Sequence, residues 1–258
     1  MNIYGLTDKG MVREANEDCI GISCLKNGIT IAVVCDGMGG VAGGKIASAI
    51  AEETFMASLV EATDEIEKSK FDGKKIKAVI ESSIQKANMA VLEKAREDRS
   101  LQGMGCTLNA VVFCEPKSKI YYANVGDSRL YMIKKREIKQ LSKDHSYVQM
   151  LVDNKEITPE EAENHPKKNL ITKALGVREE LEPDIFERKV SLKSETYFLL
   201  CSDGLHGLVP KDKLKKVAFA PISIEEKIFN YIRLANEAGG DDNISAILLC
   251  TKSSEVDR

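Results

Sequence analysis

The sequence has no long apolar run, no closely spaced cysteine pair and almost no net charge. None of its hydrophobic stretches approaches the roughly 18 residues of a membrane-spanning helix, and residues 1–10 lack the basic and apolar regions of a signal peptide. Two cysteines separated by two residues do not occur, which excludes the usual zinc motifs. We therefore expect a cytoplasmic protein that does not bind membranes.

The charge balance and composition are those of an ordinary globular protein. There are 37 basic and 40 acidic residues, a formal net charge of −3, so no basic surface for nucleic acid is expected. Hydrophobic residues make up 43% of the 258 residues, which argues against disorder. The seven cysteines lie mostly within apolar runs, and we interpret them as reduced core residues.

The hydrophobic pattern alternates between strands and amphipathic helices along the chain. It predicts strands over 19–24, 29–35, 106–114, 119–133 with an interruption at 125–129, 197–201 and 244–250. It predicts helices over 44–62, 74–95 and 223–238, and a charged connector over 63–73. We expect one catalytic domain over residues 1–251, followed by a polar tail over 252–258.

An irregular region interrupts this pattern between about 145 and 168. Within it, Thr158 can cap a helix, Pro159 suits the first turn, and Glu161 completes a capping box. We predict a small helical flap beside the functional site. The alternative is an insertion without a function.

Three apolar runs lead into an aspartate that has a glycine beside it in the chain. They lead to Asp36, Asp127 and Asp203, whereas Asp242 comes just before its apolar run. A residue at the start of one strand shares a rim with strand ends only when the strands are antiparallel. This order therefore favours antiparallel sheets over a Rossmann layout. Taken singly, each pair could also be an ordinary hairpin turn.

The first two strands place further acidic residues on the same rim. If the hairpin is symmetric about Asn27, Asp18 and Asp36 lie opposite one another. Facing carboxylates are unfavourable unless a positive charge lies between them. Glu17 and Arg13, just upstream, enter the same rim.

Such a cluster of carboxylates indicates divalent cations. Two like charges about 4 Å apart repel by roughly 4 kcal/mol at an effective dielectric constant of 20. Oxygen ligands without His or Cys partners select hard ions, Mg²⁺ or Mn²⁺ and also Ca²⁺, over zinc. Two such ions can activate a water and clamp a phosphoryl group for in-line displacement, and Arg13 could bind that phosphate in a bidentate manner.

Six motifs, in order, resemble those of the protein phosphatase 2C family and of its compact bacterial members in particular. The likeness runs from Gly5 to about Cys250. The motifs are Arg13 with Asn16, Glu17 and Asp18; Asp36, Gly37, Met38, Gly39 and Gly40; Gly103, Met104, Gly105, Cys106 and Thr107; Gly126, Asp127, Ser128 and Arg129; Ser202, Asp203 and Gly204; and Asp242 with Asn243.

The resemblance implies an α+β fold, a four-layer αββα sandwich of two stacked antiparallel β-sheets flanked by helices. It also implies a metal-dependent protein serine/threonine phosphatase that uses two or three Mn²⁺ or Mg²⁺ ions. Such enzymes hydrolyse phosphoserine and phosphothreonine by attack of a metal-bridging hydroxide. The catalytic residues would be Arg13, Asp36 and Asp127.

The resemblance assigns a role to each acidic residue of the rim. Asp36 would bridge two metals, the Gly37 carbonyl would ligate one of them, and Asp203 and Asp242 would ligate the other. Asp127, together with Asp203, would hold a third metal, Arg13 would hold the substrate phosphate, and Glu17 and Asp18 would act through metal-bound water.

One residue departs from the family pattern. Many eukaryotic members have His where this chain has Met38, and that His is assigned as the general acid for the leaving oxygen. A thioether cannot donate a proton. We hypothesise that a metal-bound water near Asp127 protonates the leaving group, with His206 as a weaker candidate.

Two other functions are considered. Residues 39–45 nearly spell a nucleotide-binding P-loop, but Ile46 stands where that motif needs Ser or Thr. The chain could also be an inactive phosphatase-like module that binds partners, although every expected carboxylate is present. For an active enzyme we expect a monomer acting on phosphorylated proteins, with a Ser/Thr kinase or a sigma-factor regulator among its partners.

Overall fold

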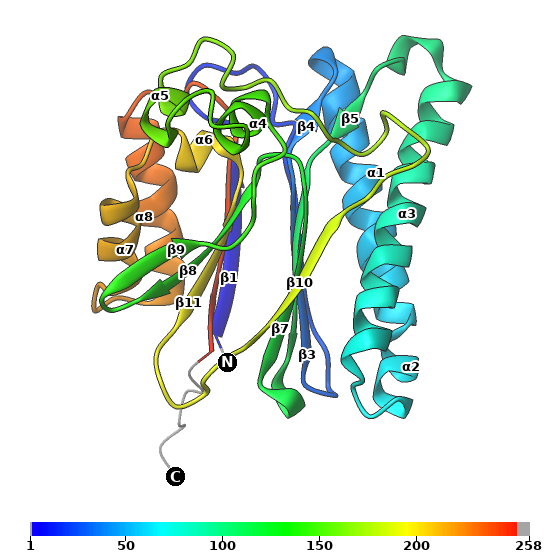
Figure 1. Cartoon of the computed structure of the whole chain (residues 1–258), viewed down its shortest axis with the longest axis vertical. Coiled ribbons are helices and arrows are strands. Elements are labelled where there is room, and N and C mark those ends of the chain that lie inside the picture. Colours follow the sequence, from blue (N-terminus) through cyan, green and yellow to red (C-terminus); the bar gives the residue numbers. More distant parts are fainter. Residues whose placement is uncertain (1, 252–258) are drawn as a thin grey trace.

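Two five-stranded antiparallel sheets stack face to face with helices outside both, as the computed structural model shows for residues 2–251 (Figure 1). The order of layers is helices, sheet, sheet, helices. The predicted four-layer α+β sandwich is therefore confirmed. The polar tail predicted over 252–258 lies outside the described residues.

The first sheet contains the hairpin that was predicted from the sequence. Its strand order is β10 (Asp184–Lys189), β7 (Lys119–Val125), β6 (Leu108–Cys114), β3 (Ile29–Cys35) and β2 (Cys19–Cys24). All seven residues of β3 are buried, because an inner strand of a sandwich has apolar layers on both faces.

The second sheet joins the two ends of the chain. Its order is β1 (Asn2–Asp8), β12 (Ile244–Cys250), β11 (Tyr197–Cys201), β8 (Arg129–Lys134) and β9 (Glu137–Gln140). A small third sheet pairs β4 (Gly37–Met38) with β5 (Gly105–Cys106). The edge strands β1, β9 and β10 were not predicted.

Helices cover the outer face of each sheet. The long α1 (Gly40–Glu61) and α3 (Gly73–Glu97) pack on the first sheet, and α6 (Asp203–His206), α7 (Lys211–Ala218) and α8 (Ile224–Glu237) pack on the second. The charged connector predicted over 63–73 joins α1 to α3 and contains a short helix, α2 (Thr63–Lys68), that was not predicted. The 3₁₀ turns are Arg99–Leu101 and Glu115–Lys117. None of the helices in the described part is long and apolar enough to cross a membrane.

Three apolar layers hold the sandwich together. The middle layer lies between the sheets, where Ala32, Val34 and Phe113 of the first sheet meet Phe198 and Ile247 of the second. The other two layers lie between each sheet and its helices. Burial of apolar surface at about 25 cal/mol per Å² makes these layers the main source of stability. They leave the polar strand ends at the edges of the sandwich.

The link between β7 and β8 passes from one sheet to the other. Residues 126–128 connect Val125 in the first sheet to Arg129 in the second. The alternative of a hairpin turn around Asp127 is therefore wrong. Asp36 likewise leads into β4 and then α1 rather than into a turn back along β3.

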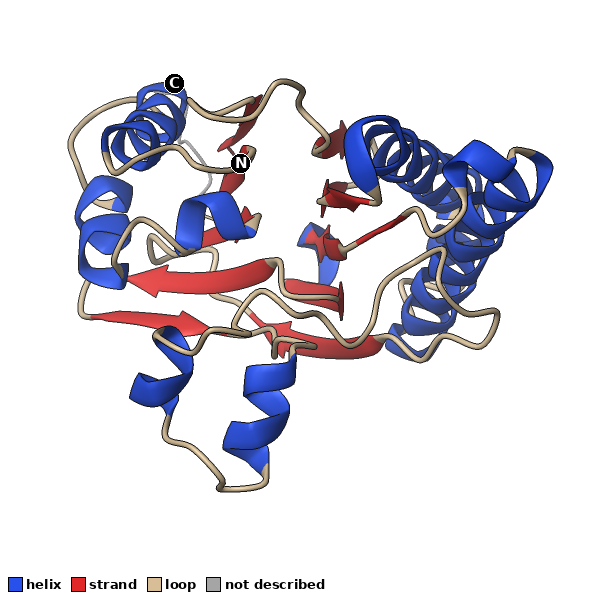
Figure 2. Ribbon diagram, turned by 90° about the horizontal axis from the view of Figure 1, so that it is seen from above, coloured by secondary structure: helices blue, strands red, loops and turns tan. Residues whose placement is uncertain are grey.

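The predicted flap is helical and stands apart from the sandwich. It contains α4 (Tyr147–Asp153) and α5 (Pro159–Glu163), the pair of short helices that project from the sandwich in the view from above (Figure 2). The capping box is confirmed: the Glu161 N–H donates to Thr158 Oγ1 at 3.2 Å, and the Thr158 N–H donates to Glu161 Oε2 at 2.7 Å.

Candidate functional site

Five aspartates gather where strands of both sheets begin or end, and we call them the carboxylate rim. The pairing of Cys19 with Cys35 makes Asp18 and Asp36 the next opposed pair, as predicted. The chain places each of the others beside a strand. The members of the rim are Asp18 before β2, Asp36 after β3, Asp127 after β7, Asp203 after β11 and Asp242 before β12.

The electrostatics of Asp36 show that these five groups interact. Burial raises the pKa of Asp36 well above its ordinary range, and the charges of the other four rim aspartates raise it further. Burial also raises the pKa of Asp203. The Asp242 charge raises this pKa further, and a hydrogen bond with Asp36 lowers it. Without cations, some of these carboxyl groups must therefore keep a proton at neutral pH.

Asp18 and Asp127 are shifted in the same way. Burial raises the pKa of Asp18 to about 7 against the opposing effect of hydrogen bonds from Ser245 and Ser202. For Asp127, burial and then the charges of Asp203 and Asp144 raise the pKa to about 7. A rim of this kind favours its ionised form only when a positive charge is added.

The rim also contains an unsatisfied ligand atom. Ser202 Oγ donates to Asp18 Oδ2 at 2.8 Å, whereas the buried Asp18 Oδ1 has no hydrogen-bond partner. Buried polar atoms are normally paired, so this oxygen fits a water or ion. The donors are all oxygens, which suits Mg²⁺ or Mn²⁺.

Within residues 2–251, no group of three or more His, Cys, Asp or Glu side chains is spaced to hold a metal ion as it stands. The rim thus supplies the residue types and the charge for a hard cation. The assignment of individual ligands stays a prediction.

Glycines allow Glu17 to approach the rim. The Glu17 carboxylate lies against Gly44, where a Cβ would collide with it. A Cβ on Gly37 would collide with the backbone of Gly44 and Glu17, so the turn after Asp36 needs glycine here. Burial raises the pKa of Glu17, which Arg13 lowers and Asp242 raises.

Polar side chains behind the rim explain two of the motifs. Thr107 fixes the backbone of Asp36 through two hydrogen bonds. The Asp36 N–H donates to Thr107 Oγ1 at 3.0 Å, and the Thr107 N–H donates to Asp36 O at 2.8 Å. Asn243 ties segments together by accepting from the Glu17 N–H at 2.8 Å and donating to Ala15 O at 2.9 Å. Neither role was assigned from the sequence, although both residues belong to the motifs.

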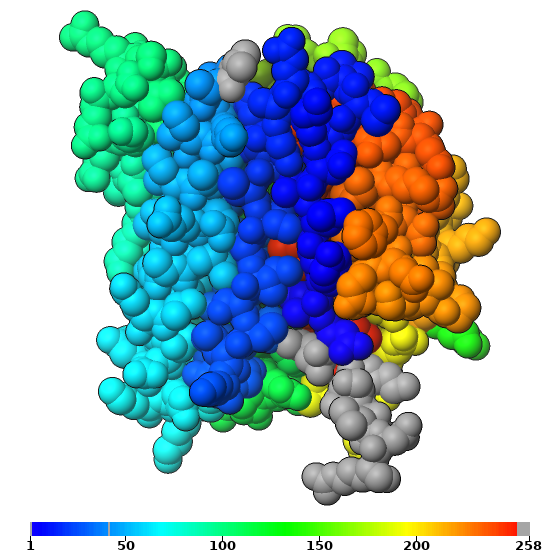
Figure 3. All heavy atoms as spheres, turned by 180° about the vertical axis from the view of Figure 1, so that it is seen from behind, coloured from blue at the N-terminus to red at the C-terminus, as the bar shows by residue number. Residues whose placement is uncertain are grey.

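Arg13 lies at the rim, as predicted. Its Nη2 donates to Asp242 Oδ2 at 2.8 Å, and its side chain is 53% exposed. The N–H groups of Met11 and Val12 donate to Gly240 O at 2.7 and 3.2 Å, which fixes the N-terminal segment against the loop after α8. Figure 3 shows the blue N-terminal residues and the orange α8 side by side. An exposed guanidinium in this position can reach an anion bound at the rim.

Met38 and His206, the two residues considered for the general acid, lie in different surroundings. Met38 pairs with Gly105 in the small third sheet and carries no titratable proton. His206 lies next to Asp127, with its Nε2 at 3.1 Å from Asp127 O. Burial lowers the pKa of His206 well below its usual range, and the nearby Arg129 charge lowers it further. His206 is therefore neutral at pH 7.

A buried ion pair beside Asp127 was missed. Arg129 Nε and Nη2 donate to Asp144 at 2.7 to 3.1 Å, and Gln140 Nε2 donates to it at 2.8 Å. We call this pair the Arg129–Asp144 brace. The available signal was the Arg that ends the Asp127 motif and an Asp after β9, but nothing in the pattern predicts their pairing.

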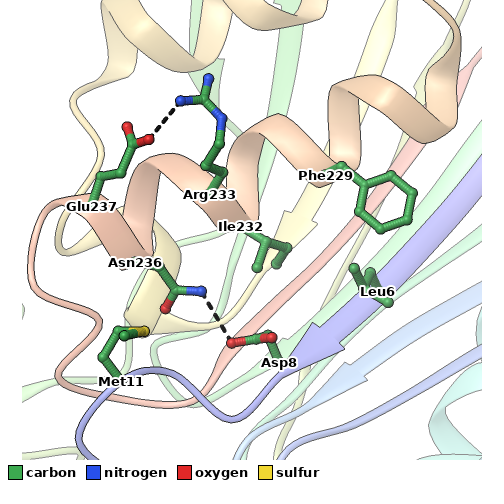
Figure 4. A pocket seen from close by; sticks show the side chains of 8 residues that line it. All are labelled: Leu6, Asp8, Met11, Phe229, Ile232, Arg233, Asn236 and Glu237. Carbon is green, nitrogen blue, oxygen red and sulfur yellow. Dashed lines mark hydrogen bonds and ion pairs between the residues drawn. The ribbon is translucent and has the colours of Figure 1, made fainter.

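A hollow of about 560 Å³ lies outside the rim, between β1 and α8 (Figure 4). It shares with the site only Met11, two residues before Arg13, and contains none of the rim aspartates. Asn236 Nδ2 donates to Asp8 Oδ1 at 3.2 Å across it. Its two carboxylates already have partners in the protein, Asp8 in Asn236 and Glu237 in Arg233.

The P-loop alternative finds no support in the fold. β3, the strand before residues 39–45, pairs antiparallel with both β2 and β6. A P-loop joins a strand of a parallel sheet to a helix that binds phosphate.

Comparison with known proteins agrees with the fold and the motifs. The family model described as Protein phosphatase 2C matches residues 11–248. The chain is similar to the serine/threonine phosphatase stp of Listeria welshimeri, with 37% identity over 94% of this chain and 93% of that protein. It is also similar to the protein phosphatase PhpP of Streptococcus pneumoniae, with 33% identity over the whole of both chains.

Solved structures give the same result. The Mycobacterium tuberculosis serine/threonine phosphatase PstP has a TM-score of 0.82 and 32% identity over 96% of this chain and 97% of that one. A structure of the PstP catalytic domain with two manganese ions has a TM-score of 0.79 and 31% identity, over 96% of both chains. The chain therefore belongs to the protein phosphatase 2C family of metal-dependent protein serine/threonine phosphatases.

Proposed function

We propose that the carboxylate rim is the catalytic centre of this phosphatase and holds two or three Mn²⁺ or Mg²⁺ ions. The observation that carries the proposal is the gathering of five aspartates whose pKa values burial and mutual repulsion raise, together with the unpaired Asp18 Oδ1. Cations relieve both conditions at once. A related catalytic domain with two manganese ions supports the choice of metal.

Each rim residue would have the metal-binding role that the family pattern implies. Asp36 would contact two ions, with the Gly37 carbonyl at one of them. Asp203 and Asp242 would serve the other. Asp127 would hold a third ion together with Asp203, and Glu17 and Asp18 would act through water.

The bound cations would supply the activated water and the positive charge that phosphoryl transfer requires. The protein's own groups would orient the substrate and exclude competing reactions. Arg13 would bind the phosphate, because its guanidinium is half exposed at the rim and can form two parallel hydrogen bonds to phosphate oxygens.

Residues 1–251 would act as one catalytic domain, with the flap at about 145–168 beside the site. The substrates would be phosphorylated proteins, among them a Ser/Thr kinase or a sigma-factor regulator, and the enzyme would work as a cytoplasmic monomer. Phosphoproteomics of a deletion strain would identify the sites that accumulate phosphate.

A direct assay tests the catalytic proposal against the alternative of an inactive binding module. The purified protein should hydrolyse a phosphothreonine peptide and p-nitrophenyl phosphate with Mn²⁺ and stop when EDTA is added. Hydrolysis of neither substrate with any divalent ion would contradict the proposal and favour the binding module.

A further inference from the structure

Two of the three histidines in the chain contact the backbone of the link that carries Asp127. On one side, the Gly126 N–H donates to His145 Nδ1 at 3.2 Å, and the His145 N–H donates to Gly126 O at 2.9 Å. On the other side, His206 Nε2 lies 3.1 Å from Asp127 O. Side chains from two other parts of the chain thus hold this link, one at Gly126 and one at Asp127.

The link that carries Asp127 needs such partners. It crosses between the sheets, so no strand ladder fixes its peptide groups. Gly126 has φ +98°, and a Cβ there would lie 2.6 Å from Thr107 Cγ2, so the link is also sterically confined. Asn124 Nδ2 adds a hydrogen bond to Gly126 O at 3.0 Å.

The contacts define which nitrogen of each ring carries the proton. Because His145 Nδ1 accepts from an N–H, its proton is on Nε2, which faces Asp184 Oδ2 at 3.4 Å. Because His206 Nε2 faces a carbonyl oxygen, that nitrogen carries the proton and donates it. The N–H of His206 is therefore engaged with Asp127 and not with a leaving group.

We propose that His145 and His206 are positioning residues, which orient Asp127 by holding the Val125–Gly126 peptide before it and the Asp127–Ser128 peptide after it. The inference rests on the proposed role of Asp127 at the rim. His145 also receives the Thr172 N–H on its carbonyl oxygen at 2.7 Å, and Ser146 forms a bridge with Ile171. His145 thus couples the base of the flap to the rim.

The two rings predict opposite patterns of rescue. Asparagine places an oxygen near the position of Nδ1, so His145→Asn keeps an acceptor for the Gly126 N–H, whereas His145→Gln does not. Glutamine places an amide near the position of Nε2, so His206→Gln keeps a donor for Asp127 O, whereas His206→Asn does not. Alanine at either position removes the contact.

The first test measures kcat with Mn²⁺ on a phosphothreonine peptide and on p-nitrophenyl phosphate. Loss of a residue that orients a ligand typically costs about 10- to 100-fold. We expect His145→Ala and His206→Ala to lower kcat on the peptide at least roughly tenfold. The aryl phosphate, whose leaving group needs no acid, should be less affected. Only His145→Asn and His206→Gln should recover most of the rate.

The second test needs no metal and no activity. Hydrogen exchange of the Gly126 amide in the metal-free protein should be fast in His145→Ala and His145→Gln, and slow in wild type and in His145→Asn. His165→Ala, at the remaining histidine of the chain, should leave that exchange unchanged. The ¹⁵N NMR chemical shifts of the imidazole rings of wild-type His145 and His206 should show that Nδ1 carries no proton in either residue.

The outcomes separate this inference from the proposed function. If wild type hydrolyses neither substrate, the proposed function fails, while the exchange data still test the contact between His145 and the Gly126 N–H. If wild type is active but asparagine and glutamine rescue equally at both positions, or the Gly126 amide exchanges alike in all variants, the positioning role is overturned.

Discussion

Asp127 and Asp144 are equally buried neighbours in opposite situations. Each residue is 8% exposed, and the Asp144 charge contributes to the raised pKa of Asp127. Asp144 receives hydrogen bonds from Arg129 and Gln140. The hydrogen bond to the Asp127 carboxylate that lowers its pKa comes from its own backbone N–H.

The difference supports a structural role for Asp144 and the proposed ligand-binding role for Asp127. A buried charge is stable when partners in the protein neutralise it, and the Arg129–Asp144 brace does this for Asp144. The carboxylate rim brings five aspartates together instead, and its nearest cation, Arg13, pairs with only Asp242 at 2.8 Å. The brace should therefore serve stability, and the rim should serve cation binding and catalysis.

The largest expected effect comes from breaking the rim at Asp36. Asp36→Asn keeps the shape of the side chain and removes a charge on which the proposed ion site depends. We expect kcat/KM on a phosphothreonine peptide to fall by roughly 10³-fold or more, because cations contribute several kcal/mol to this chemistry. The metal-free variant should unfold at the wild-type temperature or above it. Retention of more than a tenth of the activity would exclude a central role for Asp36.

Breaking the brace should give the converse result. Asp144→Ala leaves Arg129, whose side chain is 24% exposed, without its carboxylate partner. We expect the free energy of unfolding to fall by about 3 kcal/mol, as measured by urea denaturation. As a matched control, Asp153→Ala removes the Asp partner of an exposed pair with Lys143 and should cost less than about 1 kcal/mol. Equal losses in both variants would show that the Arg129–Asp144 brace stabilises the fold no more than an exposed ion pair does.

The pH dependence of the metal-free protein should reflect the rim. The pKa values of Asp18 and Asp127 are about 7 in the fold and about 3.8 in an unfolded chain. Between these values the folded state binds more protons, so unfolding free energy falls as pH rises from about 4 to 7. Without metal, the unfolding temperature should be several degrees higher at pH 5 than at pH 8. Saturating Mn²⁺ should reduce or reverse that difference, and a metal-free profile rising toward pH 8 would contradict it.

The smallest expected effect concerns Arg13 at the exposed edge of the rim. Arg13→Ala should raise KM for a phosphopeptide about tenfold, equivalent to about 1.4 kcal/mol, because one charge-assisted phosphate contact is lost. Arg233→Ala is the control, since Arg233 is an exposed arginine paired with Glu237 on α8. If both variants have the same KM, Arg13 is not a phosphate ligand.

Local patterns predicted much of the fold. The hairpin of β2 and β3 was predicted to the residue, because a turn sequence lies between two apolar runs, and its register put Asp18 opposite Asp36. The capping box predicted at Thr158 likewise marks a real helix start. In each case the signal lies within a few residues of the feature that it predicts.

Features that depend on distant contacts were missed or left open. β1 and β10 are half-exposed edge strands with little apolar patterning. The step of residues 126–128 between sheets looks locally like a hairpin. The aspartates of the rim were identified from repeated strand-end motifs, but the brace and the histidines around Asp127 are set by tertiary packing alone.

Calorimetric titration of the metal-free protein with Mn²⁺ measures directly whether the carboxylate rim binds cations. We predict that wild type binds two or three ions, that binding releases protons near pH 7 because the rim carboxyls must ionise, and that Asp36→Asn loses most of this binding. Asp144→Asn, in the brace, should retain the ion count. Equal Mn²⁺ binding by wild type and Asp36→Asn would contradict the role of Asp36 in a cation site at the carboxylate rim.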